Sequence, residues 1–328
     1  MRIALESSMV SASILLDGGI LWEPSFRLAN GRWVMPLAKA PWADDTSATA
    51  KGDPAYIRRL GGAFLGLPFG GRAIDAVVGN WSIARGEAPL HGRCATAIWR
   101  VIDQQADRAT ITLDFLDDTA VVSVEQTFVC AADAARIDVA ITIYARRAET
   151  LAVGYHPILR LPDDPRALEL RTDFVRGHSG PRDSDVARTR HDSSFGRLDA
   201  IPAKSGDTID MVHLPIDEPV EELLLLGRVD GPVVARYHDT AYDLILDWDR
   251  AILPNCLIWY HDRAEVTPPW NGRFRGLGLE PCASAFDFSA ATSNGDNPLT
   301  AAGERTAINL SPVAPTTIRL SLAVEAFA

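Results

Sequence analysis

The sequence has no long hydrophobic run and no excess of positive charge. No stretch reaches the roughly 18 consecutive apolar residues of a membrane-spanning helix. Lysine and arginine total 32 and aspartate and glutamate total 43, so the formal net charge is −11. Because negative charge repels phosphate groups, we expect neither nucleic acid nor a membrane surface as a partner. The segment Met1–Pro24 contains Glu6 and Asp17 and no secretory signal pattern, which favours a cytoplasmic protein.

Closely spaced cysteines and two common catalytic motifs are also missing. The four cysteines lie far apart and form no CxxC pair, so we expect buried reduced thiols and no structural metal site: Cys94, Cys130, Cys256 and Cys282. A GxSxG motif is absent, which excludes the usual serine hydrolase. The glycines of Gly61–Gly71 are not followed by the Lys-Ser/Thr of a phosphate-binding loop, and we interpret them as tight turns.

Helical periodicity is scarce, whereas alternation with a period of two runs along much of the chain. Ile137, Val139, Ile141 and Ile143 lie on one face of a segment whose intervening residues are mostly polar. Such alternation is typical of strands with one buried face. The strongest alternating segments are Thr110–Phe115, Val122–Phe128, Arg136–Tyr144, Glu221–Leu226, Val233–Tyr237, Tyr242–Trp248 and Ile318–Val324. Their short spacing predicts an all-β fold, an antiparallel sandwich.

Two segments are predicted to be loops, and neither divides the chain. Thr172–Leu198 is polar and contains few large apolar residues, and Pro41–Gly52 is a second candidate. No linker rich in proline, glycine or serine separates two halves, and no repeat of fixed length is present. We therefore expect residues 1–328 to form a single large β domain.

Three short segments place a titratable side chain beside glycine or proline. They are Leu90-His91-Gly92, Gly154-Tyr155-His156-Pro157 and Leu279-Glu280-Pro281. Glycine and proline restrict the backbone, so these side chains can be presented at a strand end. Glu280 is the most informative, because a carboxylate in an apolar strand is costly unless it is paired or used.

The other histidines lack such surroundings in the sequence. We interpret them as structural residues or as solvated strand ends: His178, His191, His213, His238 and His261. Taken singly, His91 and His156 would receive the same interpretation. Their order along the chain relative to Glu280 is what separates them from the rest.

Read in order, the motifs resemble those of a known superfamily. The series is Arg59-Leu60-Gly61-Gly62, Leu67-Pro68-Phe69-Gly70, His91-Gly92 with Trp99 eight residues after the histidine, Gly154-Tyr155-His156-Pro157, Leu279-Glu280-Pro281 and Gly303-Glu304. It resembles the galactose mutarotase-like superfamily, which includes the aldose 1-epimerases and the hexose-6-phosphate 1-epimerases. The resemblance covers most of the chain.

The resemblance implies a fold, an activity and a site. The fold would be a large twisted antiparallel β-sandwich, and the activity the interconversion of the α and β anomers of an aldose without a cofactor. By position, Glu280 matches the general base and His156 the general acid, and His91 matches the histidine that helps to hold the sugar. The implied partner is a small sugar, and the protein would be a monomer or homodimer.

Several positions depart from the superfamily pattern around the expected substrate. Tyr155 stands where asparagine is usual, Arg93 where an apolar residue is usual, Ala95 where many relatives have arginine, and Leu60 interrupts Arg-Gly-Gly. Candidate substrate-binding residues are Arg59, Arg93, Tyr155, Trp259 and Trp270, together with one acidic residue among Asp243, Asp247 and Asp249.

Two alternatives to an aldose 1-epimerase remain open from the sequence. The departures at Tyr155 and Arg93 would also suit a protein that binds sugar on the same scaffold without turnover. A sugar phosphate is the second alternative, because arginine binds phosphate bidentately; the candidates are Arg58, Arg59, Arg72 and Arg93.

Overall fold

The fold is built almost entirely from β-strands. A computed structural model describes residues 1–45, 47–50, 52–71, 77–84, 89–182, 184–216 and 218–327; Arg72 lies outside this range. The strands are β1 (Arg2–Glu6), β2 (Val10–Leu15), β3 (Ile20–Arg27), β4 (Trp33–Val34), β5 (Ala63–Gly66), β6 (Arg100–Gln104), β7 (Arg108–Asp114), β8 (Val121–Cys130), β9 (Arg136–Ala145), β10 (Glu149–Leu151), β11 (Val153–Arg160), β12 (Leu168–Ser179), β13 (Ser194–Phe195), β14 (Ile201–Pro202), β15 (Thr208–Ile209), β16 (His213–Leu214), β17 (Val220–Tyr237), β18 (Tyr242–Trp248), β19 (Asn255–Asp262), β20 (Arg275–Ala283), β21 (Ile308–Leu310) and β22 (Thr316–Ala326).

The helices of the described residues are single turns. They are α1 (Ala55–Arg58), α2 (Gly92–Thr96), α3 (Ala290–Asn294) and α4 (Pro298–Ala301). None of the helices in this part of the chain is long and apolar enough to cross a membrane. The absence of helical periodicity in the sequence agrees with these short elements.

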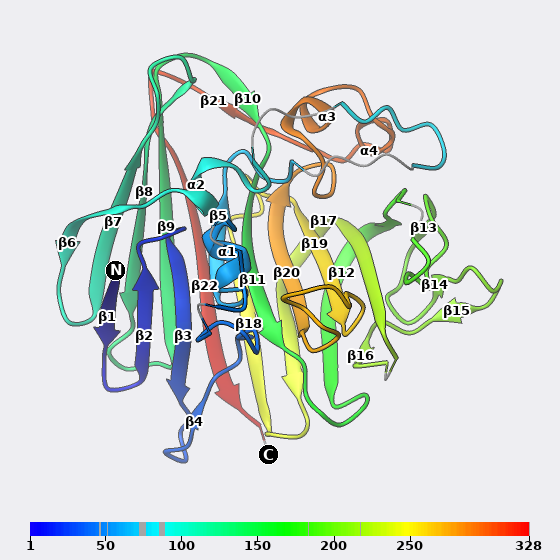
Figure 1. Cartoon of the computed structure of the whole chain (residues 1–328), viewed down its shortest axis with the longest axis horizontal. Coiled ribbons are helices and arrows are strands. Elements are labelled where there is room, and N and C mark those ends of the chain that lie inside the picture. Colours follow the sequence, from blue (N-terminus) through cyan, green and yellow to red (C-terminus); the bar gives the residue numbers. More distant parts are fainter. Residues whose placement is uncertain are drawn as a thin grey trace.

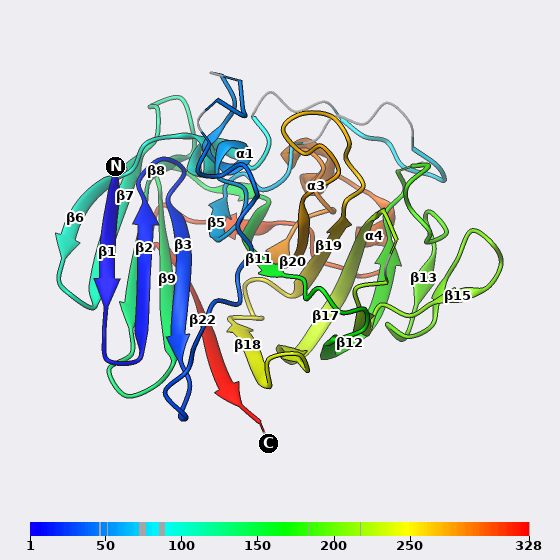
Figure 2. The same cartoon turned by 60° about the horizontal axis from the view of Figure 1, so that its bottom comes forward.

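Two antiparallel sheets share the long strand β17. In the first sheet the pairing runs β1–β2–β3–β5–β11–β20–β19 and reaches the first part of β17. In the second it runs β6–β7–β8–β9–β22–β18 and reaches the last part of β17. Strand β12 pairs along both parts. Figures 1 and 2 show β1–β3 lying over β7–β9, so the two sheets form layers of a sandwich.

The alternating segments of the sequence form the strands with one buried face. In β9 the residues Ile137, Val139, Ile141 and Ile143 are fully buried, and the residues between them are half-buried. Their side chains join one hydrophobic cluster with residues of β1–β3, β18, β20 and β22. The predicted all-β antiparallel sandwich is confirmed. All four cysteines are buried and unpaired, as expected.

One predicted loop is wrong over its first eight residues and at Ser194–Phe195 (β13), and the rest of its described residues form no helix or strand. Residues 172–179 of the expected loop Thr172–Leu198 belong to strand β12, which pairs with β17 across a register shift between Arg171 and Asp173. One face of this part of β12 is exposed and therefore polar, which lowered the apolar content that marks a strand. The described part of Pro41–Gly52 contains turns and neither helix nor strand, in agreement with the prediction.

Candidate active site

The candidate site lies on one face of the first sheet, where four strands bring key side chains into register. On β11, Gly154 and Ile158 pair with Cys282 and Gly278 of β20, which places His156 opposite Glu280. On the far side of Glu280, β19 contributes its cross-strand partner Leu257. On the far side of His156, β5 contributes Phe64. These central strands lie side by side beneath α1 and α2 in Figure 1.

His91 reaches the same place from a loop. It has a left-handed backbone (φ 59°) just before α2. Its amide donates to the Gly70 carbonyl at 2.6 Å, and its own carbonyl accepts from the Leu67 amide at 3.2 Å. Two backbone hydrogen bonds therefore join the motif that contains Gly70 to the motif that contains His91, although about twenty residues separate them in the sequence.

Glycines at the site are required by close packing. A Cβ at Gly154 would collide with the ring of Phe69, which packs against His91 with ring centroids 5.1 Å apart. A Cβ at Gly278 would overlap the carboxylate of Glu280 and crowd His156. Gly278 thus leaves the floor of the site open between the two titratable groups.

Glu280 and His156 form a buried pair. Glu280 Oε1 lies 3.2 Å from His156 Nε2, and both side chains are almost completely buried. Burial raises the pKa of Glu280 well above 4.5, and the nearby Asp287 raises it further. Burial lowers the pKa of His156 well below 6.5, with His91 adding to the effect. Both shifts disfavour the charged forms, so burial favours a neutral carboxyl beside a neutral imidazole over an ion pair in the free protein.

Aromatic rings surround this pair. His156 is stacked on Phe64 with centroids 4.7 Å apart and meets His91 edge-on at 5.2 Å. Trp259 approaches His156 edge-on at 5.9 Å. Together with the apolar neighbours, these rings exclude water and explain why burial is the main cause of both pKa shifts.

A pocket of about 90 Å³ opens onto the pair. Its lining is Tyr56, Ile57, Leu60, Phe64, Leu90, His91, His156, Leu223, Leu257, Trp259, Trp270, Glu280 and Asp287. A larger hollow of about 500 Å³ crosses β8, β9, β22 and β18, but it contains none of the three predicted catalytic side chains. We therefore take the smaller pocket as the candidate active site, because the three predicted catalytic side chains line it. Among the described residues, no three of His, Cys, Asp and Glu are placed to share a metal ion.

The structure brings five of the predicted site residues into the pocket: His91, His156, Glu280, Trp259 and Trp270. Tyr155 is absent from the pocket lining, because neighbouring side chains of a strand point to opposite faces, and it is buried in the main hydrophobic cluster. Burial raises the pKa of its hydroxyl. Tyr155 thus belongs to the core of the sandwich.

The predicted acidic residue is not at the pocket. Asp243 pairs with Arg236, their atoms 2.7 Å apart, on the exposed face of β17 and β18. Asp247 and Asp249 line the larger hollow on the second sheet. Alternation along β18 aims these side chains away from the core, while Tyr242, Leu244 and Leu246 point inward.

The described arginines proposed for a phosphate also lie outside the pocket lining. Arg58 pairs with Asp17 at 2.5 Å, and Arg93 donates to the Asp114 carbonyl at 3.1 Å. Arg59 follows α1 and is half-buried. No arginine of the described residues lines the pocket.

Sequence reasoning missed Asp287 and Tyr56. Asp287 lies seven residues beyond Glu280, and its backbone carbonyl accepts from the Gly71 amide at 3.0 Å. Tyr56 belongs to α1 and meets His91 edge-on at 5.5 Å. Neither residue belongs to one of the recognised motifs. The only available signal was the position of Asp287 shortly after the Glu-Pro motif.

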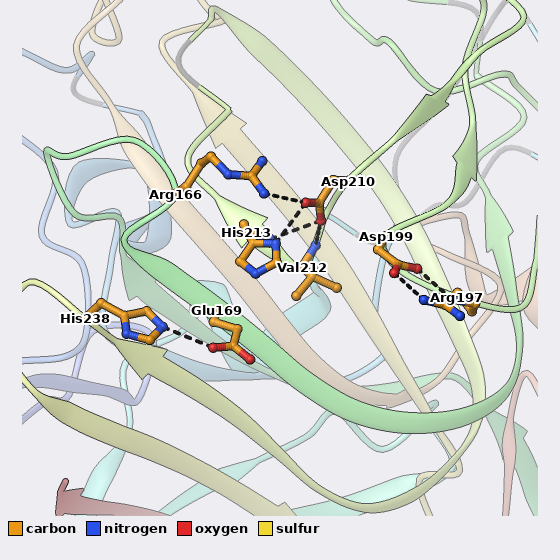
Figure 3. Close-up of polar contacts among 8 residues, drawn as sticks. All are labelled: Arg166, Glu169, Arg197, Asp199, Asp210, Val212, His213 and His238. Atoms are coloured by element: carbon orange, nitrogen blue, oxygen red, sulfur yellow. Dashed lines mark hydrogen bonds and ion pairs between the residues drawn. The ribbon is translucent and has the colours of Figure 1, made fainter. Parts of the chain in front are cut away.

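Of the five histidines interpreted as structural, three lie beside a carboxylate, and the other two line a different pocket or pack on a tryptophan. Figure 3 shows His238 beside Glu169 and His213 beside Asp210, at 3.0 and 2.8 Å. His178 lies 3.5 Å from Glu304. His191 lines a second, small pocket, and His261 packs on Trp270 with centroids 4.9 Å apart. None of the five lines the candidate site, although His261 supports the tryptophan that does.

Comparison with solved structures identifies the fold. An Escherichia coli K12 protein provisionally assigned as an aldose 1-epimerase aligns with 100% of this chain and 99% of its own, at a TM-score of 0.68 and 15% identity. The aldose epimerase homologue from C. elegans aligns with 100% of this chain and 99% of its own, at a TM-score of 0.64 and 12% identity. A galactose mutarotase-like protein from Clostridium acetobutylicum aligns with 99% of this chain and 95% of its own, at a TM-score of 0.62 and 13% identity. No protein-family model and no curated protein matches the sequence.

The chain therefore has the galactose mutarotase-like fold. Alignment over the full length at such low identity confirms the architecture that the sequence motifs implied. The side chains of the site, and not the fold, must carry the argument for activity.

Proposed function

We propose that the protein is an aldose 1-epimerase-like enzyme that interconverts the anomers of an aldose by general acid–base catalysis. The observation that carries this proposal is the convergence of Glu280 and His156, 3.2 Å apart, with His91 in one pocket. These groups come from three segments spread over nearly 190 residues. Their convergence supports a shared chemical role.

Mutarotation needs two proton transfers at one acetal carbon. Glu280 takes the proton of the anomeric hydroxyl while His156 gives a proton to the ring oxygen, and the bond between C1 and the ring oxygen breaks. Rotation about the C1–C2 bond exposes the other face of the aldehyde. The reverse transfers then close the ring, and both residues return to their starting protonation states.

The number of protons in the pair suits this reaction. A single proton on the pair is what the cycle requires, since one partner must give while the other takes. In the free protein, burial favours the form with the proton on Glu280, because it disfavours both charged forms. In the proposed mechanism, sugar binding moves this proton from Glu280 to His156, because the hydroxyls of the sugar replace part of the solvation that the charged groups lost on burial.

The decisive experiment follows anomer exchange by NMR across a panel of free aldoses. We expect exchange faster than in buffer, and a loss of roughly 10²–10⁴-fold in kcat/KM for Glu280→Gln and for His156→Asn. The matched control is Asp247→Asn, which alters a carboxylate outside the pocket and should leave the rate unchanged. Full activity in Glu280→Gln would refute the proposed roles.

A protein that only binds sugar is the second candidate. The raised pKa of Glu280 favours it, because a protonated carboxyl can hold a hydroxyl without acting as a base. Calorimetric binding of a sugar without accelerated exchange would establish this alternative. A phosphorylated substrate has less support, since no described arginine lines the pocket, and equal rates for a hexose and its 6-phosphate would remove it.

A further inference from the structure

We call the four histidine and carboxyl side chains of the pocket its polar end, and Leu223, Leu257 and Trp259, on the neighbouring strands β17 and β19, its apolar end. His91, His156, Glu280 and Asp287 gather at the polar end. Beyond Glu280, the next strand contributes Leu257 as its direct cross-strand partner. One row further along, Trp259 pairs with Leu223 of β17. The register of β20, β19 and β17 therefore places the apolar end directly beside Glu280, the proposed base.

The apolar end offers no side-chain hydrogen bond from its three main residues. Leu223 and Leu257 have no polar atoms. The indole Nε1 of Trp259 donates to Glu221 Oε1 at 3.0 Å, so this donor is already engaged outside the pocket lining. Glu221 also lies 3.8 Å from Arg182, which holds its carboxylate on that outer side.

A sugar hydroxyl placed against Leu223, Leu257 and Trp259 would lose its water without gaining a hydrogen bond from any of these three side chains. Leaving one buried hydroxyl unsatisfied disfavours binding by about 10- to 100-fold. A ring carbon that carries hydrogen or a methyl group suffers no such loss, and it gains contact with the leucines and the indole face.

We propose that the substrate of this pocket is a deoxy sugar whose hydroxyl-poor ring edge faces Leu223, Leu257 and Trp259. The inference rests on the proposed function, because it assumes that the anomeric carbon lies at Glu280 and His156. It adds the substrate class. Leu223 and Leu257 become the residues that determine specificity.

The test compares matched sugars that differ at one hydroxyl. Suitable pairs are D-glucose with 2-deoxy-D-glucose, D-galactose with 2-deoxy-D-galactose, and D-galactose with 6-deoxy-D-galactose. Anomer exchange is measured by NMR, and binding by the fluorescence of the pocket tryptophans. We expect at least one deoxy sugar to exceed its parent by about 10-fold or more in kcat/KM.

Variants of the apolar end separate specificity from folding. Leu223→Gln supplies a hydrogen-bonding group at a half-buried position, so the preference for that deoxy sugar should fall about 10-fold. Leu223→Met conserves apolar character and volume and should keep the preference. A preference that is equal in the two variants would overturn the assignment of the apolar end.

The outcomes distinguish this inference from the proposed function. If parents exchange as fast as every deoxy partner, the substrate class is wrong and the epimerase activity stands. If deoxy sugars bind more tightly but none exchanges, the activity fails and the specificity stands. Absence of both exchange and binding throughout the panel would overturn both.

Discussion

At the scale of single residues, Glu280 is a carboxyl group placed where its charged form is disfavoured. Its pKa lies above the ordinary value of 4.5 in the folded chain, so the folded state binds more protons than the unfolded state above that pH. Folding stability must then fall as the pH rises through this window. The raised pKa of Glu280 thus lowers the stability of the fold at pH values above 4.5.

Glu280→Gln should remove this pH-dependent loss of stability. Relative to wild type, we expect the variant to gain unfolding free energy as the pH rises above about 5, because glutamine has no proton to lose. Urea unfolding at several pH values measures the difference. A difference that stays constant with pH would show that the pKa of Glu280 is not raised.

Glu169 offers the matched control for that measurement. A hydrogen bond from Arg171 and then one from His238 lower its pKa to about 2, and Figure 3 shows the latter contact. The stabilisation it provides is present above the unfolded pKa and is lost as the pH falls toward 2. In a His238→Gln background, which removes the neighbouring imidazole and leaves Arg171, Glu169→Gln should therefore change the stability by a constant amount between about pH 5 and about pH 8.

At the scale of elements, the site depends on turns that only glycine can make. Gly92 has φ 69°, and a Cβ there would overlap the Leu67 carbonyl, which lies in the segment that holds His91. Gly92→Ala should cost about 1–3 kcal/mol of stability and reduce anomer exchange. Gly196→Ala, at a site with nothing within 4 Å, is the control. Equal melting temperatures and rates for the two variants would contradict this account.

The same elements show how far the sequence could predict the structure. Period-two segments became β7, β8, β9, β17, β18 and β22. Burial alternates along β8, β9, β18 and β22, whereas β7 is buried on both faces and alternates in sequence because Thr110 and Thr112 stand between its apolar residues. Strands β11 and β20 are buried on both faces, so they carry no alternation, and only their motifs marked them. The exposed polar face of β12 hid that strand within a predicted loop.

The candidate site was predicted where short motifs carried it. His91, His156 and Glu280 were grouped by motif order, and the register of β11 with β20 places two of them together. Asp287 and Tyr56 belong to no motif, so only the three-dimensional structure reveals them. Tyr155 could have been excluded from the sequence, since it is adjacent to His156 on a strand and must face the other way.

At the scale of the whole molecule, the two sheets share one hydrophobic cluster. Leu279 of β20 and Leu322 of β22 are both buried in it. We propose that the chain unfolds as one unit, as expected for a single domain. Leu279→Ala and Leu322→Ala should each cost about 2–5 kcal/mol and shift one common calorimetric transition. Two transitions, each moved by only one variant, would divide the molecule into two domains.

The place of β22 between β9 and β18 bears on how the protein is made in the cell. A ribosome must add the roughly 170 residues between β9 and β22 before the edge of β9 receives its partner. At about 5–20 residues per second, that edge waits on the order of ten to thirty seconds. During synthesis an unpaired strand rich in isoleucine and valine is a template for aggregation, so we expect nascent chains of this protein to depend on chaperones.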